Sequence, residues 1–223
     1  AHIFGQDEFG RDMLMRILWS IRSSLFMGAL SIALSCIVGG LFGAIAGYYG
    51  GKLDNVIMRI MDVFLAIPSM LLAIAIVAAF GTSLVNVLLA IGISYVPTFA
   101  RTVRAPILTV KGQDYIEAAK AVGASDFRII FKYILPNSMA PIIVQVTLGV
   151  AGAILSIAGL SFLGLGIQPP TPEWGAMLSA ARTYMRDYPH MVLFPGIAIA
   201  LVVLSLNMLG DGLRDALDPK LKQ

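Results

Sequence analysis

The fold is decided by one polar stretch in an otherwise apolar chain, Gln113-Asp-Tyr-Ile-Glu-Ala-Ala-Lys-Ala-Val-Gly-Ala-Ser-Asp-Phe-Arg-Ile-Ile-Phe-Lys-Tyr-Ile-Leu-Pro136. Its pattern predicts two short helices joined by a turn. Asp114, with Glu117 three residues later, has the spacing of a capping box that begins a helix. Gly123 suits the left-handed conformation that closes the first helix. Ser125 is then expected to cap the second helix and Pro136 to end it.

The first of these predicted helices carries small side chains, among them Ala118 and Ala119. A surface of this kind lets another protein approach closely. On composition alone, a solvated loop between membrane spans is the simpler interpretation, because charged loops are common. The residues by themselves leave both interpretations open.

Outside this stretch the composition is that of a membrane protein. Hydrophobic residues make up 58% of the chain and charged residues 13%, with a mean hydropathy of +0.84. A soluble domain is about half apolar and about a quarter charged. We therefore predict an all-α integral membrane protein that forms one transmembrane domain over residues 1–223. The net charge of +3 is too small to argue for nucleic acid, and the single cysteine, Cys36, cannot form an intrachain disulfide.

Five segments are apolar and long enough to be membrane spans, since a spanning helix needs about 20 mostly apolar residues. They are residues 25–48, 57–80, 84–100, 141–165 and 191–209. Gly39, Gly43 and Gly47, at four-residue spacing, predict close helix contact in the first span. Pro68 is expected to kink the second.

The distribution of Lys and Arg predicts the orientation. Most of these residues fall on the side of the polar stretch, so the positive-inside rule places loop 101–138 and the C-terminus in the cytoplasm. Loop 166–190 and the start of the chain then lie outside. This topology implies an earlier span that is not present in the sequence.

Several polar residues within the predicted spans are candidates for lining a pathway. Asp62 is the one carboxylate within a span, where a charge is costly and suggests function. The simpler alternative is that Arg59, three residues earlier, pairs with it. Other polar residues are as well explained by hydrogen bonds between packed helices; they are Gln145, Thr147, Ser156 and Asn207.

Enzyme and metal motifs are hard to find. The two histidines, His2 and His190, both fall on the outer side of the predicted topology, and the sequence has no HExxH or CxxC pattern. The serines and threonines of the spans have no nearby base to activate them. An ion-coupled carrier usually buries several carboxylates, and this chain has Asp62 at most. We therefore predict a scaffold or path whose energy is supplied elsewhere, and no metal site.

A resemblance to a known family adds to this interpretation. Glu117-Ala-Ala, then Gly123, then Leu135-Pro136 resembles the EAA loop of the membrane subunits of ABC importers; Tyr133 stands where the family has Ile. Three further segments resemble the C-type permease of dipeptide and oligopeptide importers, with Gln6 in place of the usual Thr; they are residues 4–12, 162–175 and 210–219.

The resemblance implies a type I importer fold with six spans, of which the first is absent here. It implies a heterodimer with a B-type permease, two cytoplasmic ATPases that bind ATP and Mg, and an extracytoplasmic substrate-binding protein. The assembly would lie in a bacterial or archaeal cytoplasmic (inner) membrane. This chain itself would bind no cofactor.

In this assembly the helix that starts near Asp114 would be the coupling helix. Glu117 would be both a helix cap and a docking contact, or a cap alone. Peptides are the expected cargo, and nickel chelates or glutathione are alternatives that the sequence leaves open. An ion-coupled carrier or a membrane enzyme is a less favoured alternative.

Overall fold

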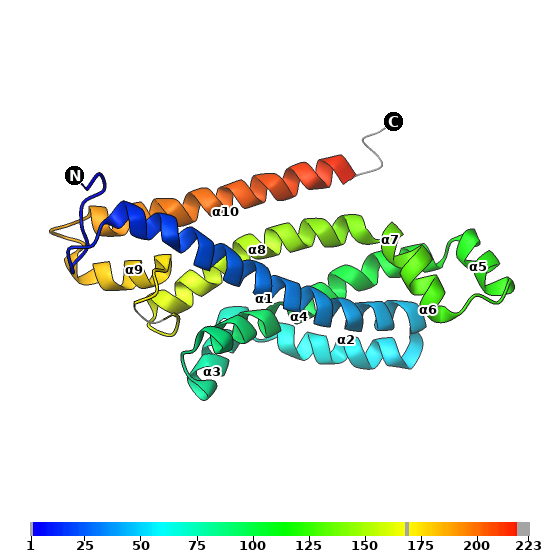
Figure 1. Cartoon of the computed structure of the whole chain (residues 1–223). Helices are drawn as coiled ribbons and strands as arrows, with labels where there is room; N and C mark the ends of the chain where they lie inside the picture. Colours follow the sequence, from blue (N-terminus) through cyan, green and yellow to red (C-terminus); the bar gives the residue numbers. More distant parts are fainter. Residues whose placement is uncertain (1, 168–169, 218–223) are drawn as a thin grey trace.

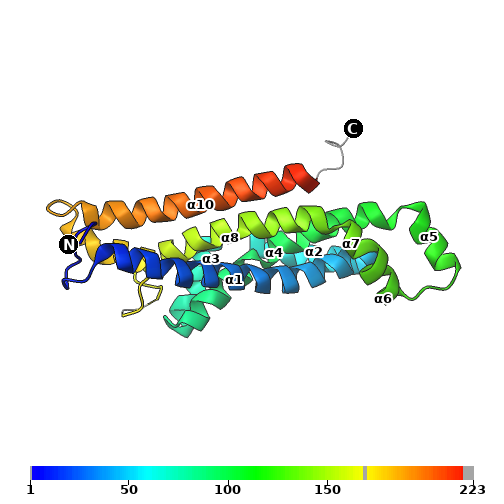
Figure 2. The same cartoon turned by 45° about the horizontal axis from the view of Figure 1, so that its top comes forward.

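The computed structural model describes residues 2–167 and 170–217 as an elongated bundle of helices. Four helices of the described part are long and apolar enough to cross a membrane, or five spans if a sharply bent pair is counted as one. The four are α1 (Met13–Tyr49), α4 (Leu84–Lys111), α8 (Met139–Phe162) and α10 (His190–Leu217). They run along the length of the molecule in both views (Figures 1 and 2). The all-α membrane fold is therefore confirmed.

The bent pair is α2 (Gly51–Leu65) and α3 (Ser69–Phe80), whose axes differ by 83°. Pro68 lies between them, and its missing N–H ends the hydrogen-bond ladder of α2. The kink expected at Pro68 is confirmed, but residues 57–80 do not form one straight span. Helices α1, α4 and α10 run past their predicted ends, because polar residues continue the α-helical backbone beyond the apolar core.

Helix α1 packs on α4 through glycines. A Cβ atom on Gly39 would lie 2.4 Å from the carbonyl oxygen of Val96, and one on Gly43 would lie 2.3 Å from that of Ala100. No real Cβ fits at these distances, so each glycine lets the two backbones touch. Ser35 Oγ also donates to the carbonyl of Gly92 at 2.6 Å. The close contact predicted from the glycine spacing is confirmed.

The N-terminal segment folds back onto α9 (Trp174–Ala181) and the start of α10 (Figure 1). The ring of Phe4 stacks on Phe194 with centroids 4.1 Å apart. The buried indole of Trp174 donates its Nε1–H to the carbonyl of Ile17 at 3.2 Å. These contacts bring together segments from both ends of the chain.

Asp7 holds the N-terminal segment in place by accepting several hydrogen bonds. Its carboxylate accepts from the backbone N–H groups of Phe9 and Arg11, each at 2.9 Å, from Arg11 Nε at 2.6 Å, and from Arg16 Nη1. Burial raises the pKa of Asp7, but the hydrogen bonds from Arg11 and Arg16 outweigh this effect and hold its pKa below the usual value.

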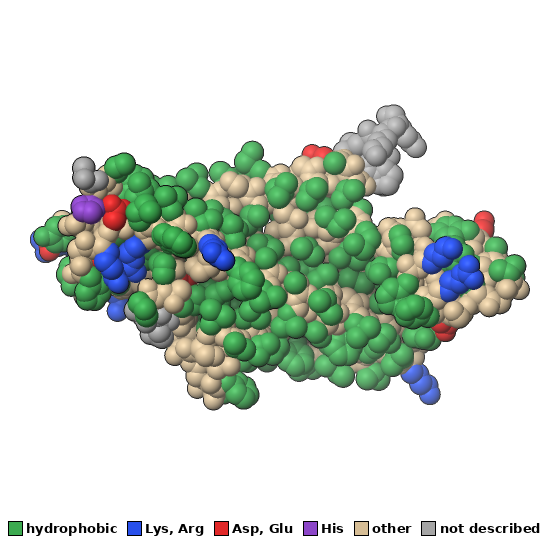
Figure 3. Space-filling model, viewed as in Figure 1, with side chains coloured by type: hydrophobic (Ala, Val, Ile, Leu, Met, Phe, Trp, Pro, Cys, Tyr) green, Lys and Arg blue, Asp and Glu red, His purple; other side chains and the backbone are tan. Residues whose placement is uncertain are grey.

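The surface agrees with a membrane location. Large apolar side chains cover the middle of the bundle, and the Lys and Arg side chains gather mainly towards its two ends (Figure 3). One end holds the N-terminal segment and α9. The other holds α5 (Asp114–Ala121) and α6 (Asp126–Arg128).

Candidate functional site

Helix α5 projects beyond the end of the bundle but is held there by one buried side chain (Figures 1 and 2). Ile116 is 0% exposed. It belongs to an apolar cluster with Val103 and Ile107 of α4, and with Ile142 of α8. Helix α5 is therefore linked through this cluster to two long helices, and a closely packed cluster resists deformation.

The start of α5 differs from the prediction. Gln113 is the N-cap residue and makes no side-chain capping bond, while Asp114 is already the first helical residue. Glu117 accordingly lies one position too far along the helix to complete a capping box. The carboxylates of Asp114 and Glu117 are exposed in the first turn. There, their negative charge interacts favourably with the positive end of the helix dipole.

The end of α5 has the predicted left-handed turn. Gly123 has φ +80°. Its N–H donates to the carbonyl of Lys120 at 2.9 Å, and the N–H of Ala124 donates to that of Ala119 at 3.0 Å. These two bonds form a Schellman motif, in which a residue with a side chain would be strained.

The second predicted helix is one continuous helical stretch over 126–137, made of α6, the π-helical segment Ile129–Ile134 and α7 (Leu135–Asn137). Ser125 caps it, since its Oγ accepts from the N–H of Arg128 at 3.4 Å. Pro136 lies inside this stretch and does not end it, which corrects the prediction. The N–H of Leu135 bonds to the carbonyl of Ile130, five residues earlier. This wider π-turn lets the helical stretch continue through Pro136, which has no N–H to donate. Leu135 packs on the apolar cluster of α5.

Tyr48, at the end of α1, ties this region to the bundle and was not predicted. Its hydroxyl donates to Asp126 Oδ1 at 2.6 Å. The ammonium groups of Lys111 and Lys120 lie 5.8 and 5.9 Å from its ring centroid, within the range of a cation–π contact. No local sequence rule joins residues 48 and 126, so only the tertiary fold reveals this anchor.

The outer face of α5 is apolar and exposed. Tyr115, Ala118 and Val122 follow the three- and four-residue spacing of one helix face, and Val122 is 84% exposed. On the neighbouring helix, Phe127 and Phe131 are exposed with ring centroids 4.4 Å apart. We name these five residues the docking face, as a candidate surface for contact with a partner. Sequence reasoning found only Ala118, although the periodicity from Tyr115 to Val122 would also have indicated those two residues.

The remaining predicted coupling residues are arranged differently around the docking face. Ala119 is half-buried and packs towards the apolar cluster, so it points away from Ala118. Glu117, Ser125 and Pro136 are exposed. The exposed set therefore combines small, apolar and acidic side chains on a firmly anchored helix.

The candidate pathway residues do not gather into one site. Thr147 and Ser156 each donate to the carbonyl four residues earlier in α8, at 3.1 and 2.9 Å. Asn207 is half-buried on α10. Gln145 helps to line a hollow of about 440 Å³ with Thr102 and Arg214.

Asp62 is the exception, because it pairs with a residue of another helix. Its Oδ1 accepts from Arg101 Nη2 of α4, not from Arg59, which corrects the prediction. Arg59 is exposed on α2, whereas α4 packs alongside α2 and brings Arg101 within reach. Arg101 was missed as a partner because the two residues are 39 positions apart.

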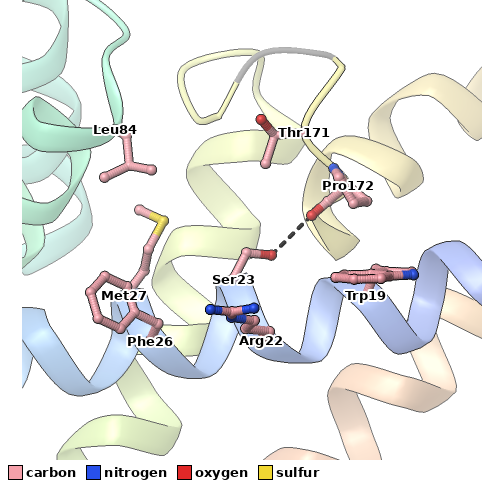
Figure 4. A pocket seen from close by; sticks show the side chains of 8 residues that line it. All are labelled: Trp19, Arg22, Ser23, Phe26, Met27, Leu84, Thr171 and Pro172. Carbon is pink, nitrogen blue, oxygen red and sulfur yellow. Dashed lines mark hydrogen bonds between the residues drawn. The ribbon is translucent and has the colours of Figure 1, made fainter.

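Another hollow, of about 370 Å³, opens beside α1 (Figure 4). Trp19, Arg22 and Phe26 of α1 line it, and Ser23 donates to the carbonyl of Pro172 at 2.9 Å. An exposed tryptophan beside arginine near the end of an apolar helix is typical of a membrane–water interface.

Comparisons with known proteins agree on one class. Residues 39–223 match the family described as "Binding-protein-dependent transport system inner membrane component". The chain is 56% identical over 221 residues to a "Dipeptide transport system permease protein DppC" of Alkalihalophilus pseudofirmus, covering 99% of this chain and 73% of the relative. It is 50% identical over 222 residues to a "Glutathione transport system permease protein GsiD" of Pectobacterium atrosepticum, covering 100% of this chain and 74% of the relative.

Solved structures show the same fold at low sequence identity. An inward-facing form of the MetNI methionine ABC transporter aligns with a TM-score of 0.75 at 18% identity, over 92% of this chain and 98% of that chain. An amino acid ABC transporter with histidines aligns with a TM-score of 0.68 at 14% identity, over 92% of this chain and 95% of that chain.

Proposed function

The chain belongs to the family of binding-protein-dependent transport system inner membrane components, and on this premise we propose that it forms half of the path of an ATP-driven importer for di- and oligopeptides. It is a transport subunit and not an enzyme. The observation that carries the coupling role is the exposed docking face, together with Ile116, which anchors the opposite side of α5.

The cargo proposal rests on the relatives. A relative that is 56% identical is named a dipeptide permease. Glutathione is the second candidate, because a relative that is 50% identical is named for it. Glutathione is itself a short peptide with an ammonium group and carboxylates, so both candidates belong to one chemical class.

The proposed partners are a B-type permease, two ATPases and a substrate-binding protein. The ATPases bind ATP and Mg, and this chain binds no cofactor. The docking face and the C-terminus lie in the cytoplasm, and the N-terminal segment with α9 lies outside. The positive-inside rule supports this orientation, since most Lys and Arg residues fall on the side of α5.

The coupling step follows from the packing. A cleft of one ATPase would hold the docking face and move it when ATP closes the ATPase pair. Ile116 then transfers that movement to α4 and α8. Glu117 makes no capping bond and is exposed, which supports its role as a docking contact.

The test is uptake by the assembled complex in proteoliposomes, with ATP inside and loaded binding protein outside. We expect ATP-dependent accumulation of labelled alanyl-alanine or glutathione. A complex that assembles and hydrolyses ATP but accumulates neither compound would contradict the proposed cargo.

A further inference from the structure

Two ion pairs join α2 to α4, and they differ in a way that suggests different roles. Asp54 receives two bonds from Arg104, Nε to Oδ1 and Nη2 to Oδ2, each at 2.6 Å. The side chain of Asp54 is 13% exposed and that of Arg104 is 32% exposed. This pair is bidentate and half-buried, the geometry of a structural bridge.

The second pair, Asp62 with Arg101, uses little of its bonding capacity. One donor, Arg101 Nη2, reaches one acceptor, Asp62 Oδ1. Among the described residues neither side chain forms another hydrogen bond. The side chains of Asp62 and Arg101 are 42% and 56% exposed, so one carboxylate oxygen and most guanidinium N–H groups remain available.

This pair lies between α2 and α4, away from the start of α2. Asp62 follows the start of α2 by three helical turns, about 16 Å at 1.5 Å per residue. Its exposed neighbours on α2 include Ile60 and Val63. A charged pair that lies within the bilayer faces a bundle interior or a water-filled cavity and not lipid. A hollow of about 310 Å³ opens here, lined by Met58, Asp62, Arg101 and Arg104, and its size falls within the roughly 300–1,000 Å³ of small-molecule sites.

We propose that Asp62 and Arg101 form a binding site for the two charged termini of a zwitterionic peptide. The peptide carboxylate binds Arg101 and the peptide ammonium binds Asp62, as the direct pair opens. One ion pair is exchanged for two, the net charge of the site is unchanged, and no charge remains unpaired. The site recognises the ends common to all short peptides, so it serves cargo of varied side chains. This inference rests on the proposed function.

The experiment compares three variants of the assembled complex: D62N, R101Q and the double variant D62N/R101Q. Uptake of labelled alanyl-alanine and of glutathione is measured per inserted complex. Each single variant is expected to lower uptake by at least about tenfold, since it leaves one charge without a partner. The double variant is expected to stay as low, because both contacts to the peptide are gone.

A merely structural pair gives the opposite result for the double variant. Replacing both members of an ion pair by neutral residues is often harmless to stability. Recovery of uptake in D62N/R101Q to within about twofold of the wild type would therefore overturn the proposal. Absence of uptake by the wild type itself would overturn the proposed cargo and this site together. Because the wild type is measured beside the variants, that outcome is distinguished from a failure of this site alone.

A labelling experiment supplies an independent readout. Met58 lines the same hollow one turn before Asp62, and replacement of Cys36, the single cysteine, gives a background free of cysteine in this chain. M58C in this background is expected to react with a charged, water-soluble thiol reagent. Loaded binding protein is expected to slow this reaction at least about threefold, because bound peptide covers the hollow. The same addition should not slow the reaction when D62N/R101Q is also present, because that variant does not bind the peptide. A Met58→Cys variant that resists the reagent would place this face against lipid and overturn the proposal.

Discussion

The hydroxyl of Tyr48 donates a hydrogen bond to Asp126 Oδ1 at 2.6 Å, and this bond joins the end of the first long helix to the loop that carries the docking face. The two residues are 78 positions apart. Together with Ile116, this contact makes the docking face part of the bundle.

The first prediction concerns this bond. Tyr48→Phe removes the hydroxyl but keeps the ring, and a hydrogen bond to a charged group contributes about 1.5–3 kcal/mol. We expect faster hydrogen exchange in residues 113–128 and several-fold less transport per ATP hydrolysed. Tyr49→Phe is the matched control, because Tyr49 is exposed. Equal effects of both changes would contradict the anchoring role.

The second prediction tests the docking face by crosslinking. In a chain without Cys36, a cysteine at the exposed Ala118 should crosslink to an ATPase subunit of the assembled complex. A cysteine at the neighbouring Ala119, which is half-buried against the apolar cluster, should not. Absence of a crosslink at Ala118 would show that this face is not the contact surface, and crosslinking at both positions would show that the contact is not confined to the exposed side.

The third prediction concerns the turn after α5. Gly123→Val places a β-branched residue at φ +80°, which costs about 1–2 kcal/mol or more. Transport and substrate-stimulated ATP hydrolysis should fall while the helices remain inserted. Gly112→Val is the control, since Gly112 has an ordinary φ of −82° at the end of α4. Normal transport by the Gly123 variant would mean that the turn does not require glycine.

The fourth prediction concerns the seam between α1 and α4. Gly43→Ala would put a Cβ 2.3 Å from the carbonyl oxygen of Ala100, whereas Gly40→Ala would meet only Val103 Cγ2 at 3.6 Å. We expect the first change to destabilise the purified protein by about 1–3 kcal/mol and the second to have little effect. Thermal unfolding in detergent measures both, and equal midpoints would contradict the close seam.

The fifth prediction concerns pH. The pKa of Asp7 is held below its usual value of 3.8, so its stabilisation is present above about pH 4 and is lost as pH falls through the lower, folded-state pKa. At pH 7, Asp7→Asn should destabilise the protein by roughly 1.5–3 kcal/mol, because Arg11 and Arg16 lose hydrogen bonds to a charged partner but remain partly exposed to water. The difference from the wild type should shrink towards pH 3. Asp187→Asn, at an exposed position, is the control and should show little difference at either pH.

Local rules predicted much of the candidate site. Gly123 and Ser125 were placed correctly because helix ends depend on residues three to five positions apart. The same local rules erred by one position at Asp114, where the backbone of Gln113 takes the capping position without a side-chain bond. They also erred at Pro136, because a π-turn can absorb a proline that an α-helix cannot.

The sequence by itself determined that this chain is an α-helical membrane protein, that Gly39 and Gly43 form a close helix seam, and that residues 113–136 form two helices at one end. Each of these properties depends on composition or on spacing within a few residues. The tertiary structure alone decided that Arg101 and not Arg59 pairs with Asp62, that Tyr48 holds Asp126, and that Ala118 faces outward while Ala119 faces inward. Those contacts depend on how α2 packs against α4 and on how α5 and α6 pack against the bundle. Such packing brings together side chains that no short-range pattern connects.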